Sequence, residues 1–208
     1  MTLVSLLEQG QLWRGSQGEL PQADQIESSG YRELDKRLTG NGWLRGQLIE
    51  LLYAGEGRGE LRLLWPLLKH FADDERPIFW IDPPYHPYPL SMLQAGIGLS
   101  AQHIVSTASN KERLWAIEQV LKSGSASLVL SWLDAGVSMS NLRRLQLAAQ
   151  AGGGLGWVMR PEEVREQSSA AAYRVLLRSS GKRLELTLLK RKGGWSLPPF
   201  AMDLPEVS

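Results

Sequence analysis

The chain has 208 residues, of which 43% are hydrophobic, and a formal net charge of +1, values typical of a single α/β domain. It contains no cysteine, which excludes disulfides, thiol catalysis and Cys-ligated zinc, and its three histidines are scattered, so we expect neither a metal nor a cofactor. Because no apolar run approaches about 20 residues and the N-terminus lacks a signal-peptide pattern, we predict a cytoplasmic protein with no membrane contact.

The chain divides by composition into three parts. Residues 1–28 end in a polar, glycine-containing stretch and are predicted to form an arm or linker. A core of residues 29–200 follows, and residues 201–208 form a tail. Within the core, a short helix is expected over 31–38. The apolar run 46–53 then predicts a strand buried on both faces, which leads through a glycine-rich loop into a helix.

The same alternation continues through the core. Strands are predicted at 77–82, 103–107, 126–133 and 155–160, and helices at 90–95, 110–124 and 138–152. Ser138 or Ser140 is expected to cap the last of these helices. Strands separated by helix-length segments predict an α/β fold with a mostly parallel sheet flanked by helices. At the end of the core, residues 172–178 and 183–192 alternate in polarity around a Ser-Ser-Gly-Lys turn and predict an antiparallel hairpin.

The glycine-rich loop occupies the position of a phosphate-binding loop. Compared with G-x-x-x-x-G-K-[ST], however, Glu60 replaces the lysine and Leu61 replaces the hydroxyl residue. A carboxylate repels the β- and γ-phosphates and leucine cannot ligate Mg²⁺, so we expect no ATP hydrolysis and no enzyme activity. The favoured interpretation is a tight turn without a ligand; the alternative is that Arg58 binds another anion. This degenerate nucleotide loop comprises Ala54, Gly55, Gly57, Arg58, Gly59, Glu60 and Leu61.

Several segments resemble the ATPase core of bacterial RecA over roughly residues 29–200. They are Ser29-Gly30, Leu34-Asp35, Gly40-Asn41-Gly42, Ile49-Glu50-Leu51, Phe79-Trp80-Ile81-Asp82 and Leu128-Val129-Leu130. The resemblance implies a RecA-like core. The departures fall at the catalytic positions, since Pro84 stands where that family has its catalytic glutamate and Ser131-Trp132 stand where a Walker B aspartate is expected.

Two further resemblances concern function. Residues 124–133 and 158–161 look like the SulA cell-division inhibitors, a family that blocks FtsZ assembly. The additional Trp13-Arg14-Gly15 arm and the basic C-terminal strand are similar to the ImuA family. We prefer the resemblance to the ImuA family, which implies a non-catalytic accessory protein of SOS-induced translesion DNA synthesis. Such a protein would bind an ImuB-type polymerase adaptor and, in addition, a DnaE-type polymerase and RecA. The alternative is a SulA-like division inhibitor that binds FtsZ.

The candidate binding residues follow from these analogies and from charge. Residues 160–195 carry nine Lys/Arg against four Glu, so basic charge is concentrated near the C-terminus. Partner contacts are predicted at Leu12, Trp13, Arg14, Lys190, Arg191, Lys192, Trp195 and Phe200. Weak, non-specific DNA contacts are predicted at Arg160, Arg165, Arg174, Arg178, Lys182 and Arg183. The aromatic residues Tyr85 and Tyr88 of a proline-rich segment are expected to pack over the degenerate loop, with a recognition surface as the alternative.

Overall fold

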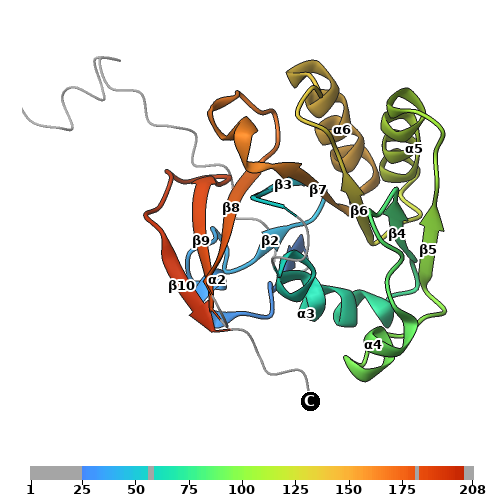
Figure 1. Cartoon of the computed structure of the whole chain (residues 1–208), viewed down its shortest axis with the longest axis horizontal. Helices are drawn as coiled ribbons and strands as arrows, with labels where there is room; N and C mark the ends of the chain where they lie inside the picture. The colour runs from blue at the N-terminus through green and yellow to red at the C-terminus, as the bar shows by residue number, and fades with distance from the viewer. Residues whose placement is uncertain (1–24, 56–58, 181–182, 204–208) are drawn as a thin grey trace, which may run out of the picture.

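The computed structural model describes residues 25–55, 59–180 and 183–203 (Figure 1). Leu12, Trp13, Arg14, Gly57, Arg58 and Lys182 lie outside these residues. In chain order the elements are β1 (Ile26–Glu27), α2 (Arg32–Asp35), β2 (Trp43–Leu44), β3 (Leu48–Tyr53), α3 (Glu60–Ala72), β4 (Ile78–Ile81), α4 (Pro89–Gln94), β5 (Gln102–Val105), α5 (Asn110–Ser123), β6 (Leu128–Trp132), α6 (Met139–Gly152), β7 (Leu155–Pro161), the 3₁₀ helix η2 (Glu162–Glu166), β8 (Tyr173–Ser180), β9 (Arg183–Lys190) and β10 (Phe200–Asp203).

The main sheet has eight strands in the order β10-β9-β8-β3-β7-β6-β4-β5. The strands from β8 to β5 are parallel to their neighbours, whereas β9 and β10 are antiparallel additions. The predicted mostly parallel sheet with a C-terminal antiparallel hairpin is therefore confirmed. The third antiparallel strand, β10, falls in a segment for which the sequence pattern predicted no strand.

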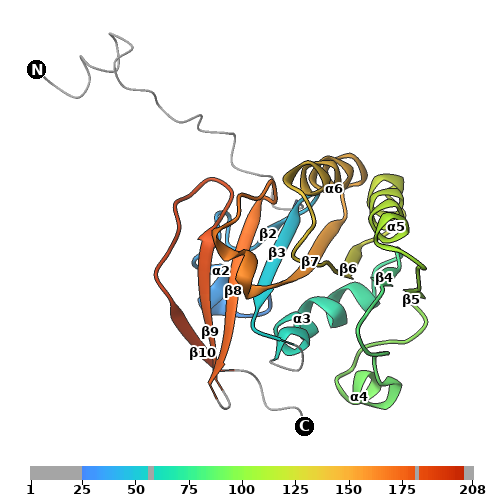
Figure 2. The same ribbon diagram turned by 45° about the horizontal axis from the view of Figure 1, so that its top comes forward.

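Helices cover both faces of this sheet, with α3 on one face and α5 and α6 on the other (Figure 2). All six residues of β3 are buried, as the uninterrupted apolar run predicts for a central strand. Helix α3 presents an apolar stripe that includes Leu64, Leu67 and Phe71 to its face. On the other face, α5 and α6 pack against each other and against Leu48 and Val158.

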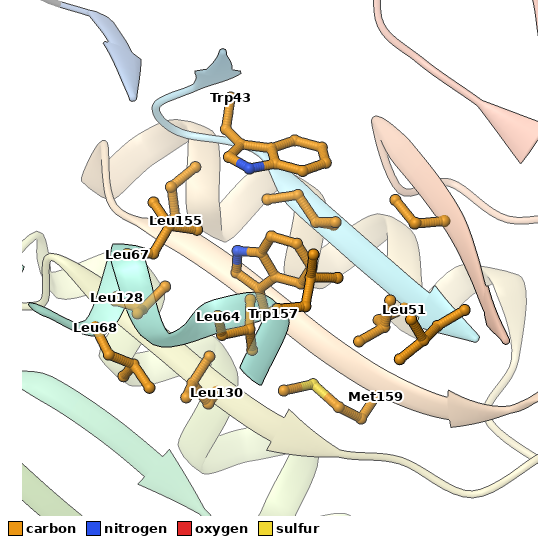
Figure 3. Packing of buried hydrophobic residues seen from close by; sticks show 14 of the residues in the cluster. Trp43, Leu51, Leu64, Leu67, Leu68, Leu128, Leu130, Leu155, Trp157 and Met159 are labelled. Atoms are coloured by element: carbon orange, nitrogen blue, oxygen red, sulfur yellow. The ribbon is translucent and has the colours of Figure 1, made fainter. Parts of the chain in front are cut away.

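Tryptophans form the centre of the larger core. Trp43 of β2 lies close to Trp157 of β7 (Figure 3), and the two rings meet edge-to-face with centroids 5.1 Å apart. Trp43 also meets Tyr173 of β8 edge-to-face, with centroids 5.2 Å apart. Such edge-to-face pairs contribute roughly 0.5–1.5 kcal/mol beyond the area they bury. These contacts fix the N-terminal segment of the described chain to the middle of the sheet.

The segment before β3 is more structured than expected. Strand β1 pairs with β2 in a small separate antiparallel sheet, although its residues fall in the predicted arm. The helix expected over 31–38 is shorter and spans only Arg32–Asp35. Gly30 precedes it with φ of +81°, and a Cβ there would lie 2.1 Å from Cβ of Pro66, so this close approach to α3 requires glycine.

None of the helices within the described ranges is both long and apolar enough to cross a bilayer.

Candidate functional site

A hollow of about 720 Å³ lies at the carboxyl ends of the parallel strands, where ligands bind in open α/β sheets. Its walls come from the ends of β3, β4, β6 and β7. Ala54 and Gly55, the first residues of the degenerate loop, line it, together with Asp82, Arg113 and Trp132. The hollow therefore lies at the position where a nucleotide loop would hold phosphate.

The described part of the degenerate loop does not favour phosphate. Gly59 takes a left-handed conformation, with φ of +97°, and is the N-cap residue of α3. Glu60, the first residue of α3, is 94% buried, and its carboxylate lies at the positive end of the helix dipole. A negative side chain thus occupies the end of the helix that attracts phosphate in a functional loop. Leu61 packs against the apolar core.

Asp82 forms the polar centre of the hollow. It follows β4 with φ of +47°, a conformation that few non-glycine residues adopt. Its carboxylate accepts hydrogen bonds from the backbone N–H of Thr107 at 2.7 Å, from the Thr107 hydroxyl and from Arg113 Nε at 2.7 Å. Partial burial alone would raise the pKa of Asp82, but the hydrogen bonds from Thr107 and Arg113 outweigh it and lower that pKa below its ordinary value. Asp82 is therefore an ionised structural anchor that ties the ends of β4 and β5 to α5.

A buried ion cluster lies beneath the same edge of the sheet. Glu50 is fully buried, and Arg160 Nη1 donates to its Oε1 at 2.6 Å while Arg174 Nε donates to its Oε2. The second terminal nitrogen of Arg160 donates to the carbonyls of Ala135 and Val137 at 3.0 and 3.2 Å, and Arg174 donates to carbonyls of η2. The cluster thus joins the loop that contains Ala135 and Val137, and the helix η2, to the central strand β3.

Burial of these two arginines corrects part of the predicted DNA-binding set. Arg160 is 1% exposed and Arg174 is 7% exposed, so neither presents its charge to a phosphate backbone. They are enclosed because β7 and β8 flank β3: Arg174 lies opposite Glu50 in the register, and Arg160 lies opposite Leu52, two residues further along β3.

The remaining described arginines of that set are exposed but lie next to carboxylates. Arg178 pairs with Glu162, Arg165 lies 3.0 Å from Glu166, and Arg183 lies 2.8 Å from Asp203. The basic excess seen in the sequence is therefore divided among separate pairs and does not form a continuous strip.

The C-terminal partner-binding candidates also have different environments. Lys190 Nζ donates to the carbonyl of Ser169 at 3.1 Å, and burial, followed by the nearby Arg174 charge, lowers the pKa of Lys190. Phe200 is half-buried, packs against the core and lies beneath the guanidinium of Arg37, 4.2 Å from its ring centroid. Trp195, by contrast, is 89% exposed. Lys192 is also exposed, and Arg191 is half-buried.

An exposed apolar surface around α4 and β5 is the feature that sequence reasoning largely missed. We call it the α4–β5 surface; its members are Tyr85, Tyr88, Leu90, Leu93, Leu99 and Ile104, all at least 36% exposed. The two tyrosines do not pack over the loop as expected, since they are 73% and 63% exposed. The available signal was the i, i+3 spacing of Leu90 and Leu93 in a helix whose only buried residue is Met92.

Strand β5 forms one edge of the main sheet, so its outer side has no strand partner among the described residues. Its four residues, Gln102–Val105, carry no charged side chain that would discourage another strand from pairing there. Within the described ranges, no group of three or more His, Cys, Asp or Glu side chains is placed to hold a metal ion.

Comparison with known proteins identifies the family. The family model for the cell division inhibitor SulA matches residues 46–156, just over half of the chain. The chain belongs to the SulA family. The SulA protein of Photorhabdus laumondii is 34% identical over 113 residues, which cover 54% of this chain and 63% of that protein. The SulA protein of Edwardsiella piscicida is 32% identical over 125 residues, covering 60% and 74% respectively. The crystal structure of SulA from Pseudomonas aeruginosa aligns with a TM-score of 0.46 at 24% identity, covering 54% of this chain and 97% of that one.

These matches correct the functional prediction. The expected role in translesion DNA synthesis and mutagenesis was wrong, because the relatives are named as cell division inhibitors. The ImuB-type adaptor is likewise unsupported as a partner. The features that favoured the ImuA family, the Trp13 arm and the basic C-terminal strand, both lie outside the part of the chain that matches SulA. That part contains β3 to β6, the hollow's glycine loop and the whole α4–β5 surface.

Proposed function

We propose that this protein is a cell-division inhibitor that acts in the cytoplasm by binding FtsZ and catalyses no reaction of its own. The observation that carries the proposal is the SulA match over residues 46–156, which includes every member of the α4–β5 surface. The absence of enzyme activity is supported by the replacement of the phosphate-binding lysine and hydroxyl residue by Glu60 and Leu61.

The α4–β5 surface is the contact that we propose for FtsZ. Exposed apolar side chains on α4 and an edge strand without Lys, Arg, Asp or Glu offer apolar anchors and main-chain hydrogen bonds along β5 to one partner. Leu90 and Leu93 are 56% and 52% exposed, so each has most of its apolar surface still to bury on binding.

We also propose that the fold is RecA-like. A buried strand, β3, leads through a glycine loop into α3, and parallel strands flank β3 on both sides. This arrangement supports the RecA-like interpretation of residues 29–200.

The test is inhibition of FtsZ assembly, measured by sedimentation and light scattering with GTP. We expect the purified protein to suppress assembly, and the double variant Leu90→Asp/Leu93→Asp to require at least about tenfold more protein for the same effect, because it places two charges in the contact. Leu147→Asp, at a 54% exposed position on α6, is the matched control and should inhibit normally. Circular dichroism establishes that each variant is folded. Failure of the unmodified protein to bind FtsZ would overturn the proposed function, whereas equal loss in both variants would overturn only the assignment of the surface.

A further inference from the structure

We infer that the turn between β9 and β10, with Trp195 at its tip, is a second docking surface, which accepts an acidic, apolar-bearing segment of a protein partner. This surface consists of Arg191, Lys192 and Trp195 of the turn, together with Arg32 of α2 and with Lys36 and Arg37, which follow that helix. It lies outside the part of the chain that matches SulA and at the other end of the sheet from β5 (Figure 1). It is therefore separate from the proposed FtsZ contact.

Trp195 is the most exposed large hydrophobic residue of the described chain, at 89%. Single exposed apolar residues are common, so exposure alone indicates little. A tryptophan, however, is the side chain most enriched at interface hot spots, because it supplies a large rigid area for burial. Trp195 can act as such an anchor only if the fold holds its indole ring outward.

The backbone of the turn is anchored on both sides of Trp195. Arg191 pairs with Gly194 in an isolated bridge, and Arg191 Nε donates to the Trp195 carbonyl at 2.8 Å. After the tryptophan, the Leu197 N–H donates to the Leu188 carbonyl at 3.0 Å, and Leu197 packs against the core. The indole is thus presented from a fixed backbone, which reduces the entropy lost when a partner binds.

The same arginine joins the turn to α2. Arg191 Nη1 donates to the carbonyl of Arg37 at 2.7 Å, and a Cβ on Gly193 would lie 3.3 Å from Thr39. At Gly194 a Cβ would lie 2.5 Å from Arg191 Nε, so a larger residue there would displace the guanidinium from its two carbonyl partners. Two segments separated by about 150 residues therefore form one surface.

The charge of this surface indicates the chemistry of its partner. Five basic side chains lie on it or beside it, against two carboxylates, Glu33 and Asp35. Both carboxylates are occupied: Glu33 pairs with Lys36 and Arg37 at 3.1 and 3.0 Å, and Asp35 accepts from Ser28 and from the Ser29 N–H. The side chains of Arg32 and Lys192 make no ion pair with the described residues and remain available. An exposed aromatic anchor on a surface where basic side chains outnumber carboxylates fits an acidic segment that carries an apolar side chain.

A protein segment fits this surface better than single-stranded nucleic acid. Non-specific strand binding uses several aromatic platforms in a row, whereas the turn presents one. The other aromatic residue of the neighbourhood, Phe200, lies beneath Arg37 and is not available for stacking.

Fluorescence anisotropy tests the inference with a labelled short peptide in which glutamates flank leucine and phenylalanine. We expect the full-length protein to bind it, and Trp195→Ala and Lys192→Glu to weaken binding by at least about tenfold each. Trp115→Ala, at the 62% exposed tryptophan on α5, is the matched control and should bind normally. A version of the peptide with lysine in place of glutamate should not bind.

Three results would overturn the inference: no binding of the glutamate peptide, equal binding by Trp195→Ala, or retention of labelled oligothymidylate in place of the peptide. Because the proposed FtsZ contact lies elsewhere, Trp195→Ala should still inhibit FtsZ assembly, so a failure here is distinguishable from a failure of the proposed function.

Discussion

At the scale of single residues, burial decides what each charged side chain does. Glu50, Arg160 and Arg174 look like ordinary surface charges in the sequence, yet they form a closed ion cluster with almost no exposed area. Removing one partner of a buried pair leaves an uncompensated charge in a medium of low polarity. The cluster is therefore structural, and it holds the loop at Ala135 and the helix η2 on β3.

The first prediction concerns this cluster. Glu50→Gln leaves two buried guanidinium groups without a counter-charge, so the free energy of unfolding should fall by roughly 3–5 kcal/mol. Urea unfolding followed by circular dichroism measures it. Arg165→Ala removes an exposed arginine paired with Glu166 and should change the same quantity by less than about 0.5 kcal/mol. A loss as small for Glu50→Gln as for the control would contradict the structural role.

Asp82 allows a prediction about pH. Its pKa is lower in the folded protein than in the unfolded chain, where an aspartate titrates near about 3.9, so its ionised form stabilises the fold above that pH. This contribution is lost as the pH falls through the folded pKa. Asp82→Asn should thus lower the urea midpoint at pH 7, and the difference from the unmodified protein should narrow below about pH 4. The more exposed Asp134, 3.8 Å from Arg113, provides the control variant Asp134→Asn. A difference that stays constant over this range would contradict the assignment.

At the scale of elements, local signals predict helices and strands well where the pattern is periodic or uninterrupted. The expected helix over 60–72 is α3, and the expected strand over 155–160 is β7 with one more residue. The sequence pattern did not predict the three short strands β1, β2 and β10, which have between two and four residues each. Strands this short carry no periodicity and form only because a partner strand is placed beside them.

The cap of α6 is a prediction at this scale. The sequence left Ser138 and Ser140 as alternatives, and the structure assigns the cap to Ser138, whose hydroxyl accepts from the Asn141 N–H at 3.3 Å. Ser138→Ala should lower the free energy of unfolding by about 1 kcal/mol. Ser140→Ala loses only a contact with the Ser138 hydroxyl and should have a smaller effect. Thermal or urea unfolding compares the two, and the reverse order would contradict this cap.

At the scale of the whole molecule, the sheet has a hollow at the carboxyl ends of its parallel strands, but Glu60 and Leu61 stand where a phosphate-binding loop has its lysine and hydroxyl residue. The hollow is lined by Asp82, Asp134, Glu162 and Glu163, and also by Arg113 and Arg160. Arg113 pairs with Asp82, and Arg160 shares the carboxylate of Glu50 with Arg174. Phosphate groups would meet four carboxylates there, so we expect nucleotides not to bind this hollow.

The prediction at this scale is the absence of stabilisation by nucleotide. A ligand at free concentration c that binds only the folded state stabilises it by RT ln(1 + c/Kd), and so raises the unfolding temperature once its concentration exceeds Kd. We therefore expect millimolar Mg-ATP or Mg-GTP to shift the Tm by less than about 1 °C in a thermal-shift measurement. A rise of several degrees that is abolished by Asp82→Asn would show that the hollow holds a nucleotide.

The amino-acid sequence alone determined the order and type of the main elements, the buried centre of the sheet and the chemistry of the degenerate loop, because hydrophobic periodicity and residue identity act over a few neighbouring positions. The tertiary structure alone decided which of the five described members of the predicted DNA-binding set are exposed, that β5 lies at an edge, and that the segment after α2 contacts the Trp195 turn. These properties depend on strand order and on contacts between residues that are more than 100 positions apart, such as Glu50 with Arg160, and no local pattern encodes such contacts. The functional prediction was wrong because it relied on the N-terminal arm and the basic C-terminal strand. The segment that identifies the family is residues 46–156, which lies between them.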